Sequence, residues 1–270
     1  DRPLDKLAYD FDAAIAALAA LVDQGTAARL TEQALDLVAM AMSDRFGPGA
    51  LPSSPHRSAL LYRLKRRYPV ILVSGRHVEG LRRVSGLKGF PMVGTHGFEA
   101  EGLPGGLQMA SPALRNIFRS EAGRLRRALQ PLSRQFPGIH VERKPYSSTL
   151  HYRGVELSKA QVEGLHRGFL SVFRKTVTPR LWSLQEGKKM IEAMPRGFSK
   201  GKAVAKILAK HRGFFPLYAG DDVTDISVFK RLGKRGLKIA VGNRIPAELC
   251  DLRLDSPRSF LAWLRALAAG

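Results

Sequence analysis

Cysteine is nearly absent from this chain of 270 residues, and no long apolar run is present. The single Cys250 cannot form an internal disulfide, which excludes a disulfide-rich scaffold and agrees with a reducing compartment. The longest apolar candidate, Ala13 to Val22, has about half of the ~20 residues that a membrane helix needs. Residues 1–5 include acidic side chains where a secretory signal would be basic, so we expect a cytoplasmic protein.

Acidic residues are few, because 23 Asp and Glu stand against 44 Lys and Arg, for a net charge of +21. Such an excess attracts anions, both sugar phosphates and nucleic acids. The basic residues are spread from Arg63 to Arg265, and no helix-turn-helix, zinc-finger or aromatic RNA-binding motif accompanies them. We therefore expect nonspecific nucleic-acid binding at low salt but no specific nucleic-acid partner, and a monomer.

Short apolar runs alternate with helical segments, which is typical of a doubly wound α/β fold with a parallel sheet. The predicted strands are Leu4 to Phe11, Val70 to Val73, Pro91 to Thr95, Lys188 to Ala193, Pro216 to Ala219 and Leu237 to Val241. Helical segments are predicted at Ala13 to Met42, with a break near residues 24–26, and at Ala59 to Arg67, Gly201 to Lys210 and Ser259 to Ala269.

The sheet pattern is interrupted by an insertion, which we place at about residues 102–188. Within it, the helical patterns Leu114 to Leu132 and Ser158 to Thr176 flank an alternating strand pair, Ile139 to Arg153. The predicted organisation is a core of residues 1–101 and 189–270 with a smaller α+β domain inserted.

Aspartates gather after two of the predicted strands. Asp10 and Asp12 lie two apart, so period-two geometry sends both carboxylates to one side. A second cluster, Asp221, Asp222 and Asp225, follows the strand that ends at Ala219. In open α/β sheets the carboxyl ends of the strands border the ligand crevice, and carboxylates this close favour a hard cation such as Mg²⁺. A solvated turn is the alternative for either cluster alone.

Phosphate-binding groups are predicted at the same edge. Ser74 and Arg76 follow the strand Val70 to Val73. Lys200 comes directly after Ser199, a good N-cap, and helix N-termini bind phosphate through free N–H groups. An ordinary surface lysine is the alternative for Lys200.

The order of these motifs resembles the haloacid dehalogenase (HAD) superfamily of phosphatases and, within it, the trehalose-6-phosphate phosphatases. The closer resemblance is carried by further segments along the chain: Val73 to Arg76, Gly94 to Gly97 with Glu99, Glu142 to Lys144, His151 to Arg153, Glu192 to Pro195, Lys200 with Gly201, and Gly220 to Asp225.

This resemblance implies hydrolysis of trehalose 6-phosphate in a HAD-like core with a mobile cap. Asp10 would be the nucleophile that forms an aspartyl phosphate, and Asp12 the general acid and base. The implied Mg²⁺ ligands are Asp10, Asp12, Asp221 and Asp225, while Ser74 and Lys200 would hold the phosphoryl oxygens. The implied substrate-binding residues are Arg76, His96, Glu99, Glu142, Lys144, His151, Arg153, Glu192 and Asp222. For His96 and His151 a structural hydrogen bond is an equal alternative.

The chain departs from the family pattern after its first motif, where Ala13 and Ala14 replace Gly-Thr, and at Ile226, where Glu is usual. Alanine adopts a positive φ at a higher cost than glycine, so the loop geometry of an active enzyme is in question. A diverged or inactive sugar-phosphate-binding protein is therefore one alternative, a HAD phosphatase for another sugar phosphate is a second, and a nucleic-acid-binding protein that exploits the charge is a third.

Overall fold

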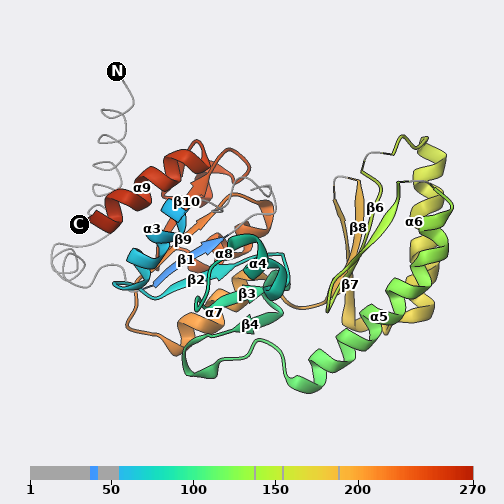
Figure 1. Ribbon diagram of the computed structural model, residues 1–270, viewed down its shortest axis with the longest axis horizontal. Coiled ribbons are helices and arrows are strands. Elements are labelled where there is room, and N and C mark those ends of the chain that lie inside the picture. Colours follow the sequence, from blue (N-terminus) through green and yellow to red (C-terminus); the bar gives the residue numbers. More distant parts are fainter. Residues whose placement is uncertain (1–36, 42–54, 137, 154, 188, 270) are drawn as a thin grey trace. The chain divides into compact units, whose positions relative to one another are not determined.

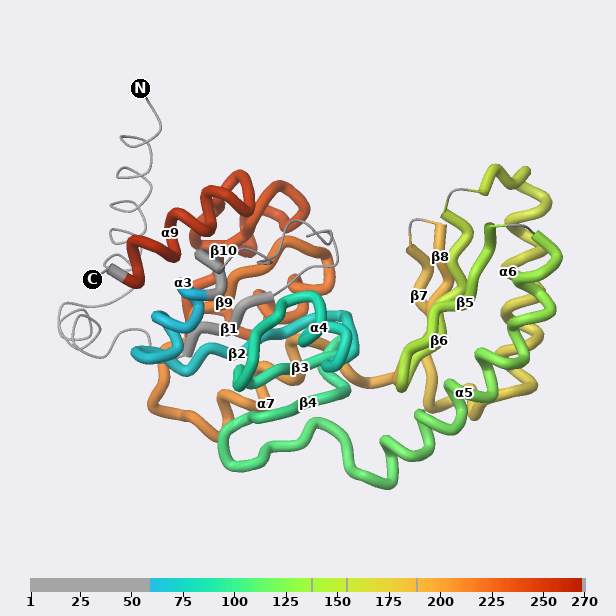
Figure 2. Tube along the Cα trace, viewed as in Figure 1, coloured from blue at the N-terminus to red at the C-terminus, as the bar shows by residue number. Residues whose placement is uncertain are grey.

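A computed structural model describes residues 37–41, 55–136, 138–153, 155–187 and 189–269 (Figure 1). These residues form two compact units. The core unit contains the described residues up to Met109 and from Ser199 onward, and the inserted unit is Ala110–Phe198. Figure 2 traces the chain out of the core unit after β4 and back into it before α7. The predicted insertion is thus a single continuous segment.

Seven strands form the sheet of the core unit, in the order β11-β10-β9-β1-β2-β3-β4. Every neighbouring pair is parallel except β3 with β4, which is antiparallel. The strands are β1 (Leu37–Ala41), β2 (Val70–Val73), β3 (Met92–Gly94), β4 (Glu99–Glu101), β9 (Pro216–Gly220), β10 (Leu237–Val241) and β11 (Leu252–Leu254). This arrangement confirms the predicted α/β class with a largely parallel sheet.

Helices cover both faces of the core sheet, because its strands are apolar on both sides. In β2, Leu72 belongs to one buried cluster and Val73 to the other. The first cluster includes residues of α3 (Pro55–Lys65), α4 (Val78–Ser85) and α9 (Pro257–Ala269); the second includes residues of α7 (Lys200–Lys210) and α8 (Ile226–Leu232). Short 3₁₀ turns are η1 (Thr95–Gly97), η2 (Pro104–Gly106), η4 (Val223–Asp225) and η5 (Ala247–Leu249).

The strand β1 corrects the sequence prediction for its segment. We expected a helix from Ala13 to Met42, yet Leu37–Ala41 pairs in parallel with both β2 and β9. Its sequence, Leu-Val-Ala-Met-Ala, is a short continuous apolar run, and periodicity alone cannot distinguish such a run in a buried strand from part of a helix. The predicted strand Leu4 to Phe11 lies outside the described residues, and the place between β2 and β9 belongs to β1.

The inserted unit is a four-stranded antiparallel sheet, in the order β5-β6-β8-β7, with two long helices packed on it (Figure 1). Its strands are β5 (His140–Arg143), β6 (Ser148–His151), β7 (Trp182–Gly187) and β8 (Met190–Pro195), and the 3₁₀ turn η3 (Pro179–Leu181) precedes β7. The helices are α5 (Pro112–Arg134) and α6 (Lys159–Thr176), each begun by a serine N-cap. Across the described ranges, no helix is long and apolar enough to cross a membrane.

The limits of the insertion also differ from the prediction of 102–188. The segment Lys188 to Ala193 was expected to return to the core sheet, but β8 pairs with β6 and β7 in the inserted unit. Every residue of β8 after Met190 is buried. A continuous buried run is typical of a central strand in a parallel sheet, which explains why the sequence suggested the core sheet. The inserted unit therefore continues to Phe198.

Candidate active site

The carboxyl edge of the core sheet carries the polar groups that the sequence placed there. Ser74 follows the last residue of β2, and Asp221 follows the last residue of β9. One strand, β1, separates them, because Ala41 pairs with Val73 and Met40 pairs with Ala219. Neighbouring strands are about 4.8 Å apart, so β2 and β9 are separated by about 10 Å, enough for a phosphate group and a cation.

A buried ion pair stands beside Asp221. Lys200 is 2% exposed and Asp225 is fully buried, and their Nζ and Oδ1 atoms lie 2.8 Å apart. The Tyr218 hydroxyl donates to the same Oδ1 at 2.7 Å. The other carboxylate oxygen, Oδ2, accepts from the backbone N–H groups of Asp221 at 3.2 Å and Asp222 at 3.0 Å. The pair thus fixes both the lysine and the loop after β9.

This bonding gives Asp225 a structural role, while its predicted contact with a metal stays a prediction. A carboxylate has about four lone-pair sites, and four donors already occupy those of Asp225. Asp225 is therefore a structural anchor of the loop. Asp222 has partners as well, because its two oxygens accept from Arg244 at 3.0 Å and from Thr224 at 3.0 Å. Within the described part of the chain, no group of three or more His, Cys, Asp or Glu side chains could hold a metal by itself.

Glycine allows the close approach that this loop requires. A Cβ added to Gly220 would lie 2.6 Å from the Cβ of Asp225, and one added to Gly201 would lie 2.0 Å from the backbone oxygen of Ser227. The first contact brings Asp225 under the end of β9, and the second brings α7 against the start of α8. Sequence analysis missed the role of Tyr218, whose pKa is raised well above its usual value by burial and by the charge of Asp225.

The loop after β2 is held by residues for which the family resemblance implies substrate contact. The Ser74 hydroxyl accepts from the Arg76 backbone N–H at 3.1 Å, and the His96 backbone N–H donates to the Ser74 carbonyl at 3.2 Å. The carboxylate of Glu99 accepts from the Thr95 hydroxyl and from the backbone N–H of Val78. His96 and Glu99 thus brace the turn that positions Ser74.

Gly75 shows how closely the same turn packs. The ring of His96 lies against it, since an added Cβ would be 2.6 Å from the ring carbon Cε1. His96 itself has a positive φ of 53°, which is uncommon for a residue other than glycine. The contact gives His96 a packing role at this turn.

A second polar group lies on the sheet of the inserted unit. Lys144 Nζ contacts Glu192 Oε1 at 3.0 Å and Glu142 Oε2 at 3.4 Å, and His151 Nε2 lies 2.9 Å from the same Glu142 oxygen. The Ser147 hydroxyl donates to Glu192 at 2.8 Å. Burial raises the pKa of Glu142, but the hydrogen bond from His151 and the charge of Lys144 outweigh it and set the pKa to about 2.

Strand register explains why this group forms. Glu142 pairs with Thr149 across β5 and β6, and Thr149 pairs with Glu192 across β6 and β8. Residues directly opposite share a face of a sheet, so the two glutamates flank Thr149 on one face. The sequence singled out four of these residues, Glu142, Lys144, His151 and Glu192, and the structure brings them together. Arg153 is exposed, just beyond the end of β6.

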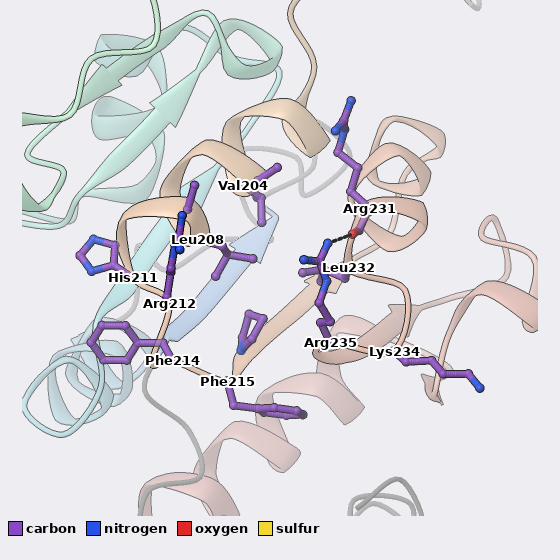
Figure 3. Close-up of a pocket in the computed structure, with 13 residues that line it drawn as sticks. Val204, Leu208, His211, Arg212, Phe214, Phe215, Arg231, Leu232, Lys234 and Arg235 are labelled. Carbon is purple, nitrogen blue, oxygen red and sulfur yellow. Dashed lines mark hydrogen bonds between the residues drawn. The ribbon is translucent and has the colours of Figure 1, made fainter.

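A pocket of about 690 Å³ lies elsewhere in the core unit, near the ends of α7 and α8 and the start of β9 (Figure 3). Apolar side chains such as Leu208, Phe214 and Leu232 line it together with four arginines and lysines, Arg212, Arg231, Lys234 and Arg235. Because Pro216 is the first residue of β9, this pocket is at the amino end of the strand, opposite the edge with Asp221. It is separate from the candidate active site.

A family model described as trehalose-phosphatase matches residues 41–248. This chain belongs to the trehalose-phosphatase family. The trehalose-phosphate phosphatase of Mycobacterium bovis is 30% identical over 224 residues, covering 78% of this chain and 54% of the relative. The trehalose-6-phosphate phosphatase of Escherichia coli is 30% identical over 204 residues, covering 73% of this chain and 70% of the relative. The chain thus spans about half the length of the mycobacterial relative.

A crystal structure described as a trehalose-6-phosphate phosphatase related protein has the same fold, with a TM-score of 0.70 and 20% identity over 87% of this chain and 97% of that one. The fold is that of the HAD superfamily. Family membership implies a general dependence on a divalent metal. The matched region begins at residue 41, so Asp10 and Asp12 precede it, and they also lie outside the described residues. Their catalytic roles stay predictions.

Proposed function

We propose that this chain hydrolyses trehalose 6-phosphate to trehalose and phosphate at the carboxyl edge of the core sheet, with Mg²⁺ bound beside Asp221. The observation that carries the proposal is the buried pair of Lys200 and Asp225, which fixes the loop of Asp221 at the sheet edge where Ser74 follows β2. An ammonium group buried at a helix N-terminus, at the sheet edge that also carries a serine hydroxyl and an aspartate, is suited to a phosphate ester with a cation.

Each described residue has a distinct role in this proposal. Lys200 has three N–H donors, and one contact, to Asp225, orients it. Its remaining donors and the Ser74 hydroxyl would hold phosphoryl oxygens and stabilise the charge that spreads over them during transfer. Glu142, Lys144 and Glu192 would bind sugar hydroxyls, because their carboxylates accept and the ammonium donates hydrogen bonds.

The carboxylate chemistry fits Mg²⁺, with Asp221 as the protein ligand among the described residues. Mg²⁺ is commonly bound by one or two carboxylates together with substrate phosphate and water, so it does not need a cage of side chains. When bound, the ion would neutralise charge on the phosphoryl oxygens. The remaining task in the core unit, which is to hold and orient the phosphate ester, belongs to Lys200 and Ser74.

Phosphate release tests the proposal. Wild type and Asp221→Asn are compared on trehalose 6-phosphate and glucose 6-phosphate, with Mg²⁺ or with EDTA. We expect release from trehalose 6-phosphate that needs Mg²⁺ and falls at least about 10-fold in the variant, because a metal ligand is lost. Asp255→Asn is the matched control, since Asp255 is exposed at the surface. Equal release by all three proteins, or release that EDTA leaves unchanged, contradicts the proposal. Asp10→Asn in the same assay tests the predicted nucleophile.

A further inference from the structure

The pocket at the amino end of β9 combines apolar walls with positive charge. Its volume of about 690 Å³ is within the range of sites for small organic ligands, which is about 300–1,000 Å³. The described residues that line it are mostly apolar, and most of these are aliphatic, such as Val204 and Leu208 of α7 and Leu232 of α8. The pocket can therefore bury the apolar body of a ligand.

The positive charge of the pocket has no acidic counterpart. Arg212, Arg231, Lys234 and Arg235 line it, and no carboxylate of the described ranges lines it or forms an ion pair with any of them. The carboxyl ends of α7 and α8 lie here, and each contributes about half a negative elementary charge. Two such ends offset about one of the four positive charges, so about three remain for a ligand.

Two of the arginines are placed to share one anionic group. In Figure 3, Arg212 lies beside Leu208 and Arg235 lies across from it, whereas the side chains of Arg231 and Lys234 extend outward. Arg235 donates a hydrogen bond from Nη2 to the backbone oxygen of Arg231 at 3.4 Å, which orients its guanidinium group. Guanidinium groups bind phosphate oxygens through paired N–H donors.

The composition of the lining argues against a sugar phosphate at this place. None of the described lining residues is Ser, Thr, Asn, Gln, Asp or Glu, so no side-chain hydroxyl, amide or carboxylate is available to bind sugar hydroxyls. Apart from the ring of His211, every polar side chain in the lining is a cationic donor. A complementary ligand has an apolar chain and two or more negative charges at one end, as an organic diphosphate has.

Three elements extend from this pocket to the candidate active site. The helix α7 begins at Lys200 and lines the pocket from Val204 onward. The strand β9 begins at Pro216 in the pocket and leads directly to Asp221. The helix α8 follows Asp225 and ends in the pocket wall. A ligand that shifts the ends of these packed elements acts on the groups to which we assign phosphate and metal binding.

On the basis of the function proposed above, we infer that this pocket is an effector site that binds an organic diphosphate with an apolar chain. The chain lies against Leu208 and Leu232, and the diphosphate accepts hydrogen bonds from Arg212 and Arg235. By thermodynamic linkage, effector and substrate change each other's Kd by the same factor, typically about 5- to 150-fold.

Calorimetric titration with geranyl diphosphate tests the site. The titration is done in EDTA, so that no metal binds the diphosphate, and at physiological salt, which screens general attraction to a basic protein. Inorganic diphosphate lacks the chain and geraniol lacks the charge. We expect geranyl diphosphate to bind wild type at least about 10-fold more tightly than either, because the chain adds apolar burial. Equal affinity for inorganic diphosphate would show attraction by charge alone and would overturn the inference.

Substitutions of the two arginines locate the bound ligand. Arg212→Gln and Arg235→Gln should each weaken binding at least about 10-fold, since each removes a hydrogen bond from a charged donor. Lys230→Gln is the matched control, because it removes the same charge from an exposed residue of α8 that does not line the pocket. All three side chains are at the surface, so we expect the variants to keep the thermal midpoint of wild type. Unchanged binding in both arginine variants would place the ligand elsewhere and would overturn the inference.

Phosphate release separates the effector role from binding and from the proposed function. With excess Mg²⁺ and with trehalose 6-phosphate below KM, geranyl diphosphate should change the rate of wild type at least about 5-fold. The same concentration should leave the rate of Arg235→Gln unchanged. Binding to wild type without a change in rate, or an equal change in Arg235→Gln, overturns the effector role. If wild type releases no phosphate under any condition, the proposed function fails, whereas the titrations still decide whether the pocket binds this anion.

Discussion

Lys200 and Asp225 form a contact of 2.8 Å in the interior of the core unit, between the first residue of α7 and the last residue of η4. Both side chains are almost completely buried. A buried pair costs desolvation free energy on both sides, and the structure offsets this cost with the further donors to Asp225. The pair thus links phosphate binding, which we assign to Lys200, to the position of Asp221.

Loss of the lysine charge should destabilise the core unit strongly. We expect Lys200→Met to lower the free energy of unfolding by about 3–5 kcal/mol, because Asp225 is left as a buried charge without its cation. Urea denaturation measures this change. Lys210→Met, an exposed lysine at the end of the same helix, should change it by less than about 0.5 kcal/mol. The double variant of Lys200→Met and Asp225→Asn should lose less free energy of unfolding than the sum of the two single variants. Losses that simply add would show that the two side chains do not interact directly.

The close approach of Asp225 to Gly220 makes a steric prediction. Gly220→Ala places a Cβ 2.6 Å from that of Asp225, so the loop of Asp221 must move. We expect a loss of about 1–3 kcal/mol in the free energy of unfolding and a weaker thermal shift with Mg²⁺ and substrate. Gly213→Ala is the matched control, because nothing lies within 4 Å of the added Cβ. Similar losses for both variants would contradict the steric explanation.

The depressed pKa of Glu142 predicts a pH dependence in the inserted unit. Its folded pKa is about 2, against an ordinary value of 4.5, so the ionised form stabilises the fold above pH 4.5. This contribution is lost as the pH falls from 4.5 toward 2. The side chain is 40% exposed, so we expect less than about 1 kcal/mol after solvent screening.

The buried Trp182 of the inserted unit reports on this change by fluorescence. The other tryptophan, Trp263 in the core unit, is best replaced by Phe, since its buried Nε1 has no hydrogen-bond partner. Urea midpoints between pH 2 and 7 should depend less on pH in Glu142→Gln, whereas Glu163→Gln on α6 should keep the wild-type slope. An unchanged slope in Glu142→Gln would show that His151 and Lys144 do not depress this pKa.

The ends of β2 and β9 could be predicted from the sequence, because each is a short apolar run followed directly by a polar residue, Ser74 or Asp221. The side chains grouped around Lys144 were also found, through a family resemblance. The placement of β1 and β8 could not be predicted from the sequence. The alanines and methionines of β1 suit helices as well as strands, and the continuous burial of β8 does not show to which sheet it belongs. The hydrogen bonds that Asp225 accepts from Tyr218 and Lys200 form only because the fold brings these side chains together. Their spacing along the chain does not predict this contact.

Glu192 shows how the inserted unit could control substrate choice. It is 4% exposed, and it accepts from Lys144 and Ser147, so Glu192→Gln removes a charge that orients Lys144. We expect kcat/KM for trehalose 6-phosphate to fall about 10- to 100-fold, in line with ~1.5–3 kcal/mol for a hydrogen bond to a charged group. The loss should fall mainly on KM, because sugar binding and not phosphoryl transfer is affected.

The control is Glu186→Gln, which removes the same charge from an exposed residue of the same sheet. Competition by inorganic phosphate should be unchanged in Glu192→Gln, since we assign phosphate to Ser74 and Lys200. A fall in kcat with constant KM would place Glu192 in the transfer step. Weaker competition by phosphate would instead indicate that the inserted unit binds the phosphoryl group, and the division of roles between the two units would then be wrong.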